Sequence, residues 1–313
     1  MRSTSTQQVI QRLGTARGLP ASLISDHLAR LPESYFAKHG PSAVIQHLEL
    51  IQHLGSERHC QLVAERQEDG YLVTVAALDQ LGAFSLIAGL LAVWGLSIQQ
   101  GEAFTYAPPA LPLGVRRPPA HYLRRYFVDT FGVRPTDPSQ PIDWTRLRDE
   151  LEELLTLAAQ GQMAEARRRL NVRVVELLRR ATATLPPELA PLEVKVSNDQ
   201  SPEYTVLDIT GEDTVAFLYE FTNALAMRGI YLGRLAINTV GTKVHDRLYV
   251  ADTQGKKLTS RRRLADVTLA AVLLKHFTHL LPRAADPELA LANFDQFIDQ
   301  VFAPEGEEHS SFN

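Results

Sequence analysis

The chain has 313 residues, of which 45 % are hydrophobic and 22 % charged, a balance typical of globular proteins with two or three compact units. A net charge of −4 argues against nucleic acid as a partner, because proteins that bind it usually carry a basic excess. The single cysteine, Cys60, fits a reducing, cytoplasmic location, and the longest apolar run, 84–98, is too short to span a membrane.

The first part of the chain, residues 1–65, is expected to be a helical N-terminal segment. Apolar residues recur at helical spacing before a break near Gly18 and Pro20. A further helix is expected to begin at Pro41, where Val44 and Leu48 form part of a stripe that would bury one face.

Residues 66–200 predict a first mixed unit. A strand over 71–77, a turn over 79–82 and a very apolar helix over 83–94 are followed by Gly95, which is typical of a helix C-terminus. Strands over 96–106 and 122–131 flank a proline-rich connection. Two helices over 143–183 then form an insertion, and alternating residues over 192–196 predict another strand.

Residues 201–283 repeat that order. Strands are expected over 204–209, 230–240 and 245–251, with helices over 215–227 and 260–281, and residues 284–313 as a C-terminal helix and polar tail. An internal repeat of this kind predicts an α+β fold of two ferredoxin-like βαββαβ units, each completed by a closing strand.

Several motifs resemble a known family. The stretch 79–84, Asp-Gln-Leu-Gly-Ala-Phe, and the stretch 95–98, Gly-Leu-Ser-Ile, resemble the ACT-domain pattern D-x-x-G, apolar helix, G-L-x-I. The stretches 204–209, 213–219 and 234–250 look like the second ACT domain of bacterial PII uridylyltransferases. Residues 30–281 share this resemblance, and the tail 286–295 is similar to the opening of glutamine synthetase adenylyltransferases.

The resemblance implies a regulatory module that binds a small amino acid, with glutamine the expected ligand, between two units. A helix N-terminus suits a carboxylate, and an aspartate before it would accept an ammonium group or cap the helix. A purely structural interpretation, in which the aspartates only cap the helices and Gly82 is a turn residue, stays open. The candidate ligand-binding residues are Asp79, Gly82, Ala83, Phe84, Asp213, Ala216, Phe217 and Leu218. Ala216 stands where the family has glycine, so its Cβ is expected to crowd a ligand there.

The resemblance does not extend to catalysis. The nucleotidyltransferase loop G-S-x-x-D-x-D is absent, and the one His-Asp pair, His245-Asp246, falls inside an expected strand. We therefore expect a non-catalytic chain without cofactor, partnered by a nucleotidyltransferase catalytic domain or a PII-type signal protein, with a homodimer through the ACT domains as one option. The alternatives are a protein-interaction scaffold that docks through the 143–183 helices, and an enzyme with an unrecognised site.

The sequence gives little support for a metal site or a catalytic nucleophile. His47, His53 and His59 recur every six residues and would not share one helix face, which argues against a metal site. Cys60 and Ser85 lack the neighbouring base that a nucleophile needs.

Overall fold

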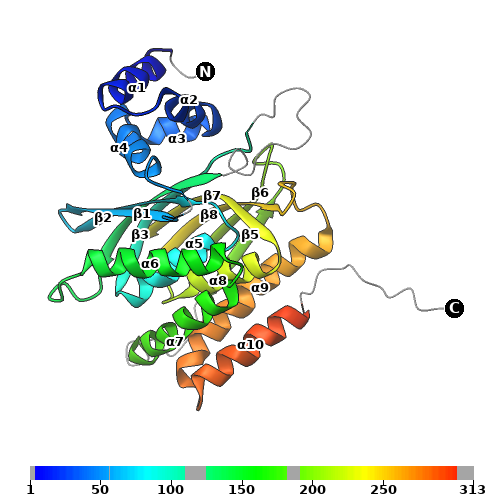
Figure 1. Cartoon of the computed structure of the whole chain (residues 1–313). Coiled ribbons are helices and arrows are strands. Elements are labelled where there is room, and N and C mark those ends of the chain that lie inside the picture. Colours follow the sequence, from blue (N-terminus) through cyan, green and yellow to red (C-terminus); the bar gives the residue numbers. More distant parts are fainter. Residues whose placement is uncertain (1–3, 56, 110–124, 182–190, 302–313) are drawn as a thin grey trace.

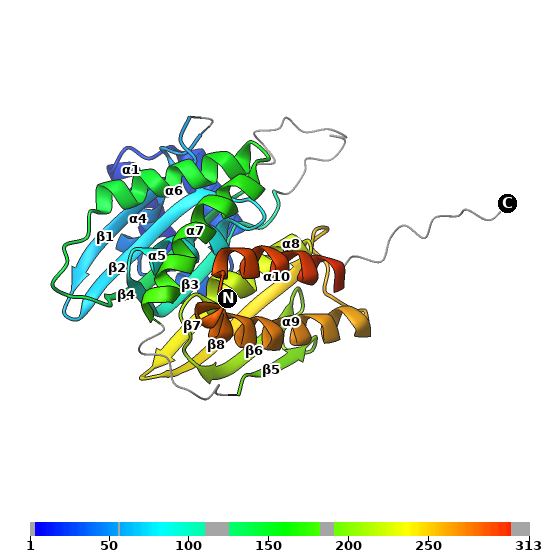
Figure 2. The same cartoon turned by 90° about the horizontal axis from the view of Figure 1, so that it is seen from below.

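The computed structural model describes residues 4–55, 57–109, 125–181 and 191–301. Eight strands form one antiparallel sheet in the order β1-β2-β4-β3-β7-β8-β6-β5. Helices α1–α4 lie on one face of this sheet and helices α5–α10 on the other (Figures 1 and 2). The α+β class predicted from the sequence is confirmed, and the sheet is compatible with two ferredoxin-like units in tandem.

The N-terminal helices are α1 (Thr4–Ala16), α2 (Ala21–Arg30), α3 (Glu33–Lys38) and α4 (Pro41–Ile51). They bury an apolar core that includes Leu28, Tyr35 and Leu48 against Phe104 and Val128 of the sheet. The helices end before the expected limit at residue 65, because β1 begins at Cys60. This strand escapes the sequence pattern because its second half, residues 65–67, is exposed and does not alternate.

The first half of the sheet contains β1 (Cys60–Gln67), β2 (Gly70–Leu78), α5 (Ala83–Val93), β3 (Leu96–Thr105), β4 (Tyr126–Pro135), α6 (Trp144–Ala159) and α7 (Met163–Ala181). The prediction that a closing strand follows the helices is wrong. Its place at the edge beside β2 is taken by β1, which arrives earlier in the chain through a tight β1–β2 hairpin.

The second half repeats this arrangement with β5 (Glu193–Ser197), β6 (Thr205–Glu212), α8 (Phe217–Met227), β7 (Ile230–Val240), β8 (Lys243–Asp252) and α9 (Arg261–Leu280), followed by α10 (Pro287–Val301). Again the edge strand comes first: β5 pairs with β6 across the expected boundary at residue 200. The strand at 192–196 therefore lies in the second half of the sheet and does not close the first.

The two halves are joined by β3 and β7, which pair antiparallel with Gln100 opposite Asn238, Glu102 opposite Ala236, and Phe104 opposite Arg234. In the repeat, Gln100 corresponds to Arg234, Glu102 to Ala236 and Phe104 to Asn238. Exchange of the two halves therefore reproduces the same pairs, so a pseudo-twofold axis passes between Glu102 and Ala236. A feature that lies between the halves but away from this axis should occur twice.

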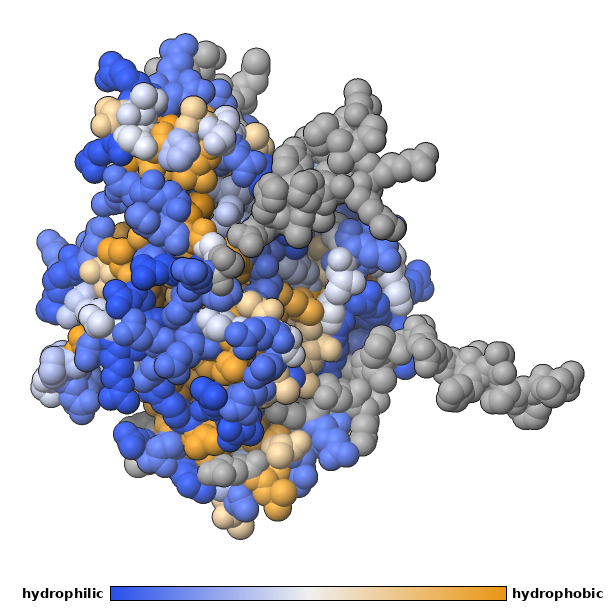
Figure 3. All heavy atoms as spheres, in the orientation of Figure 1, coloured by the Kyte–Doolittle hydropathy of each residue, from blue (hydrophilic) through white to orange (hydrophobic). Residues whose placement is uncertain are grey.

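Helices α5 and α8 lie beside each other on the helical face (Figure 2). Their close approach depends on Gly89, because a Cβ there would come within 2.7 Å of the Tyr219 ring and 2.6 Å of Leu170. On the side that Figure 3 shows, hydrophilic residues cover most of the surface between small apolar patches. Within the described ranges, no helix combines the length and hydropathy needed to cross a bilayer.

Candidate functional site

On the face of the sheet that α5–α10 cover, two hollows lie between the halves, and the repeat relates them. The same number of residues separates Asp79 from Asp213, Gly82 from Ala216, and Gly95 from Gly229. The first hollow is lined by the loop before α5 together with the end of α8 and the start of β7. The second is lined by the loop before α8 together with the end of α5 and the start of β3. Each half thus contributes its loop to one hollow and its helix end to the other.

Both loops have the same backbone shape. The residue before each helix is left-handed, with φ of 88° at Gly82 and 62° at Ala216. The aspartates are also held alike, because the amide of Asp79 donates to the carbonyl of Arg125 and the amide of Asp213 to that of Thr242. Each loop therefore presents a helix N-terminus, with its unpaired first-turn amides, next to a carboxylate.

Each loop aspartate has a basic neighbour, although the neighbour differs. Asp79 forms an ion pair with Arg125 at 2.9 Å, and only 6 % of its side chain is exposed. Beside Asp213, the ammonium group of Lys275 donates to the Glu212 carbonyl and the Thr214 hydroxyl. Burial raises the pKa of both aspartates, and the nearby cation acts against that rise in each case.

A second aspartate from the sheet lines each hollow. Asp129 on β4 lies opposite Val75, and Asp246 on β8 lies opposite Ile209. Val75 and Ile209 correspond in the repeat, so the two aspartates occupy equivalent positions in their hollows. Burial raises the pKa of Asp129 well above its usual value. The pKa of Asp246 is raised to about 7, chiefly by burial, while the amide of Asn238 opposes the rise. Neither residue was predicted from the sequence, because their equivalence appears only in the pairing of the strands.

The hollows differ greatly in size. The first has a volume of about 40 Å³, which leaves room for little more than a water molecule. The second has a volume of about 500 Å³, which is within the range of small-molecule sites. Its walls combine apolar side chains with Thr239, Arg180 and the two carboxyl groups, Asp213 and Asp246.

The structure places every candidate residue on one of these walls. Asp79, Gly82, Ala83 and Phe84 line the first hollow, and Asp213, Ala216, Phe217 and Leu218 line the second. The two groups do not meet in one pocket. Neither aspartate is an N-cap in the structure, because α5 and α8 begin without a side-chain cap. Whether these residues bind a ligand stays a prediction.

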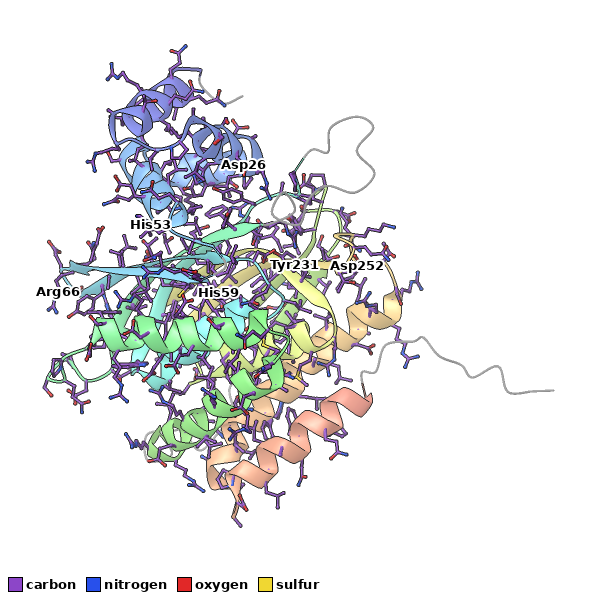
Figure 4. The ribbon with its side chains drawn as sticks, viewed as in Figure 1. Asp26, His53, His59, Arg66, Tyr231 and Asp252 are labelled. Carbon is purple, nitrogen blue, oxygen red and sulfur yellow. The ribbon has the colours of Figure 1, made fainter. Side chains whose placement is uncertain are left out.

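The isolated residues considered from the sequence have structural partners. His47 is buried and its Nδ1 lies 2.6 Å from the Tyr35 hydroxyl. His59 points to Glu152 of α6, whereas His53 is exposed at the end of α4 (Figure 4). Cys60 is buried, and its pKa is raised by burial and by the charge of Glu152, the opposite of what a nucleophile needs. The described residues include no cluster of three or more metal-ligating side chains.

The fold and the paired hollows are those of a tandem of ferredoxin-like units with a hollow of small-molecule size between them. The chain is similar to part of several bifunctional uridylyltransferase/uridylyl-removing enzymes. It is 29 % identical to that of Rhodospirillum rubrum over 214 residues, which is 68 % of this chain and 20 % of the relative. It is 24 % identical to that of Ruegeria pomeroyi over 271 residues, which is 85 % of this chain and 27 % of the relative.

The enzyme of Rhodopseudomonas palustris is also 24 % identical, over 82 % of this chain and 26 % of its own length. The chain therefore spans about a quarter or less of the length of these relatives. The resemblance to bacterial uridylyltransferases expected from the sequence is confirmed. No protein-family model matches the chain.

Proposed function

We propose that this chain is an amino-acid-sensing regulatory module of a uridylyltransferase system, and that it binds glutamine in the second hollow. The observation that carries this proposal is the second hollow itself, which joins two carboxyl groups to a helix N-terminus in a space of about 500 Å³. The relatives named above are uridylyltransferases, which supports the link to that system.

The chemistry of the second hollow suits a zwitterion. The ammonium group of an amino acid would lie between Asp213 and Asp246, because both carboxyl groups line the hollow and the second is buried and half ionised near neutral pH. The carboxylate would face the N-terminus of α8, where unpaired amides and the helix dipole favour an anion. Arg180, at the end of α7, lines the same hollow and offers a second carboxylate partner.

Regulation would follow from the position of the site. A ligand in the second hollow contacts the α8 loop of one half and the α5–β3 corner of the other, so binding stabilises one arrangement of the halves. Coupling of this kind is typically worth about 1–3 kcal/mol between two sites. We propose a nucleotidyltransferase catalytic domain or a PII-type signal protein as the recipient, in the cytoplasm, with residues 1–65 as an accessory segment before the two units.

Titration calorimetry with L-glutamine and a panel of other amino acids tests the proposal. We expect saturable binding of glutamine in the micromolar to millimolar range, about −8 to −4 kcal/mol. Asp213→Asn should abolish most of the binding, whereas the matched change Asp149→Asn, on the exposed face of α6, should leave it intact. A folded chain that binds no amino acid would refute ligand sensing.

One observation favours a second candidate, a scaffold that acts without a small ligand. The first hollow, which carries the D-x-x-G loop, has only about 40 Å³ of free space. In that case the helices α6 and α7 are the proposed docking elements. Retention of all partners from a cell extract after exchange of the exposed α7 arginines for glutamine would argue against docking there.

A further inference from the structure

A side chain from the other half of the sheet, Tyr231, occupies part of the first hollow. The start of β7 lies across the first hollow and places Tyr231 on its wall, and the start of β3 places Ser97 at the equivalent position of the second. These two residues correspond in the repeat, since each is the second residue after the glycine that follows its helix, Gly95 or Gly229. A phenol ring therefore stands in one hollow where the other has only a hydroxymethyl group.

Tyr231 lies among polar groups. Its hydroxyl is buried near the Asp79 carboxylate and Thr105 without a hydrogen bond of standard geometry, and the guanidinium of Arg125 lies over its ring at 4.8 Å from the centroid. Burial and the charge of Asp79 raise the pKa of Tyr231, so the hydroxyl keeps its proton and remains a donor. Figure 4 shows Tyr231 at the same end of the sheet as Asp252, in line with the pairing of Ile230 and Asp252.

The same groups are present but uncovered in the second hollow. Asp213 takes the place of Asp79, and Thr239 that of Thr105, so the polar groups that surround the Tyr231 hydroxyl are repeated there. With Ser97 in place of the tyrosine, the space stays open. The missing tyrosine side chain thus contributes to the larger volume of the second hollow, and the methyl group of Ala216 does not close it.

We infer that the two hollows are one site in duplicate, the first permanently filled by Tyr231 and the second free for one ligand per chain. The ligand places a hydrogen-bond donor, such as an ammonium or amide N–H, against Asp213 and Thr239, where Tyr231 places its hydroxyl against Asp79 and Thr105. This inference rests on the proposed function for the identity of the ligand, although not for the filling of the first hollow.

A reciprocal exchange of the two residues tests the inference with L-glutamine as the probe. The native chain should bind one glutamine per chain. Ser97→Tyr should lose this binding, and Tyr231→Ser should bind two. Ser139→Tyr and Tyr71→Ser are matched controls, remote from both hollows, and should keep one. Two glutamines bound by the native chain, or undiminished binding by a folded Ser97→Tyr variant, would overturn the inference.

A second measurement needs no amino acid. Tyr231→Ala should leave a space shaped for a phenol, so p-cresol should raise the Tm of this variant while leaving the native chain and Tyr71→Ala unchanged, as apolar cavities bind the groups removed from them. Absence of any rise in a folded Tyr231→Ala variant would overturn the filling of the first hollow. If p-cresol binds but the native chain binds no amino acid, the proposed function fails while the filled hollow stands.

Discussion

The two halves of the sheet share one strand order but differ in what covers them. The first half lies between α1–α4 on one face and α5–α7 on the other, so most of its strands are buried on both sides (Figure 1). The corresponding face of the second half carries polar residues such as Lys195, Thr210, His245 and Arg247. A duplicated backbone has therefore acquired one half that is covered and filled and another that keeps an open face and an open hollow.

The largest loss of stability is expected from a change where the N-terminal helices pack against the first half of the sheet. Tyr35 is fully buried, and its hydroxyl lies 3.0 Å from Nε2 of His27 and 2.6 Å from Nδ1 of His47. Tyr35→Ala should lower the free energy of unfolding by about 3–5 kcal/mol, as large-to-small changes in cores do. Urea unfolding measures the loss. Tyr35→Phe, which keeps the ring, should cost only about 1–3 kcal/mol.

If the halves are specialised as described, glutamine binding by a folded Tyr35→Phe variant should equal that of the native chain. A loss of binding in this variant would show that the N-terminal helices and the second hollow are coupled, and the comparison would need revision.

Acid should weaken the same contact. Burial, with a smaller contribution from neighbouring histidines, lowers the pKa of His27 and of His47 to about 3. Because both folded values lie below the ordinary 6.5, the unfolded chain takes up protons first, and this stability is lost as pH falls below about 6.5. Each histidine should contribute about 1.4 kcal/mol per pH unit between pH 6 and 4. Urea midpoints at pH 7 and pH 5 that do not differ would contradict this expectation.

The second half should respond to pH in the opposite sense through Asp246. Its raised pKa of about 7 means that the folded state holds a proton that the unfolded carboxyl, at 3.8, has released. Stability is therefore lost as pH rises from about 4 through 7. Asp246→Asn should be more stable than the native chain by about 4 kcal/mol at pH 8 and nearly equal to it at pH 4. Asp149→Asn, on exposed α6, should show no such difference.

Several parts of this arrangement were predictable from the sequence. The repeat, the apolar helices α5 and α8 and the loop aspartates have local signals, because glycines and hydrophobic periodicity mark them directly. The edge strands were predictable only in part: β1 lacks alternation beyond Leu62, whereas β5 was expected as a strand but its partner is fixed only by tertiary pairing. Tyr231 was also hidden, since its role depends on the opposite half of the molecule.

The smallest change in stability is expected at the residue before each buried helix, where the two halves can be compared directly. Gly82 adopts φ of 88° at no steric cost, whereas Ala216 is the only described residue other than glycine with positive φ. Ala216→Gly should therefore raise the free energy of unfolding by up to about 1 kcal/mol, because a left-handed alanine is strained by about that amount.

The reverse change has a second cost in the first half. A Cβ on Gly82 would lie 3.1 Å from Cε of Met163, so Gly82→Ala combines backbone strain with crowding. We expect a loss of about 1–2 kcal/mol, larger than the gain from Ala216→Gly. Urea midpoints of both single variants and of Gly82→Ala with Met163→Ala separate the two causes. If the additional Met163→Ala change restores none of the loss, strain alone governs both loops and the crowded first half has no part in the difference.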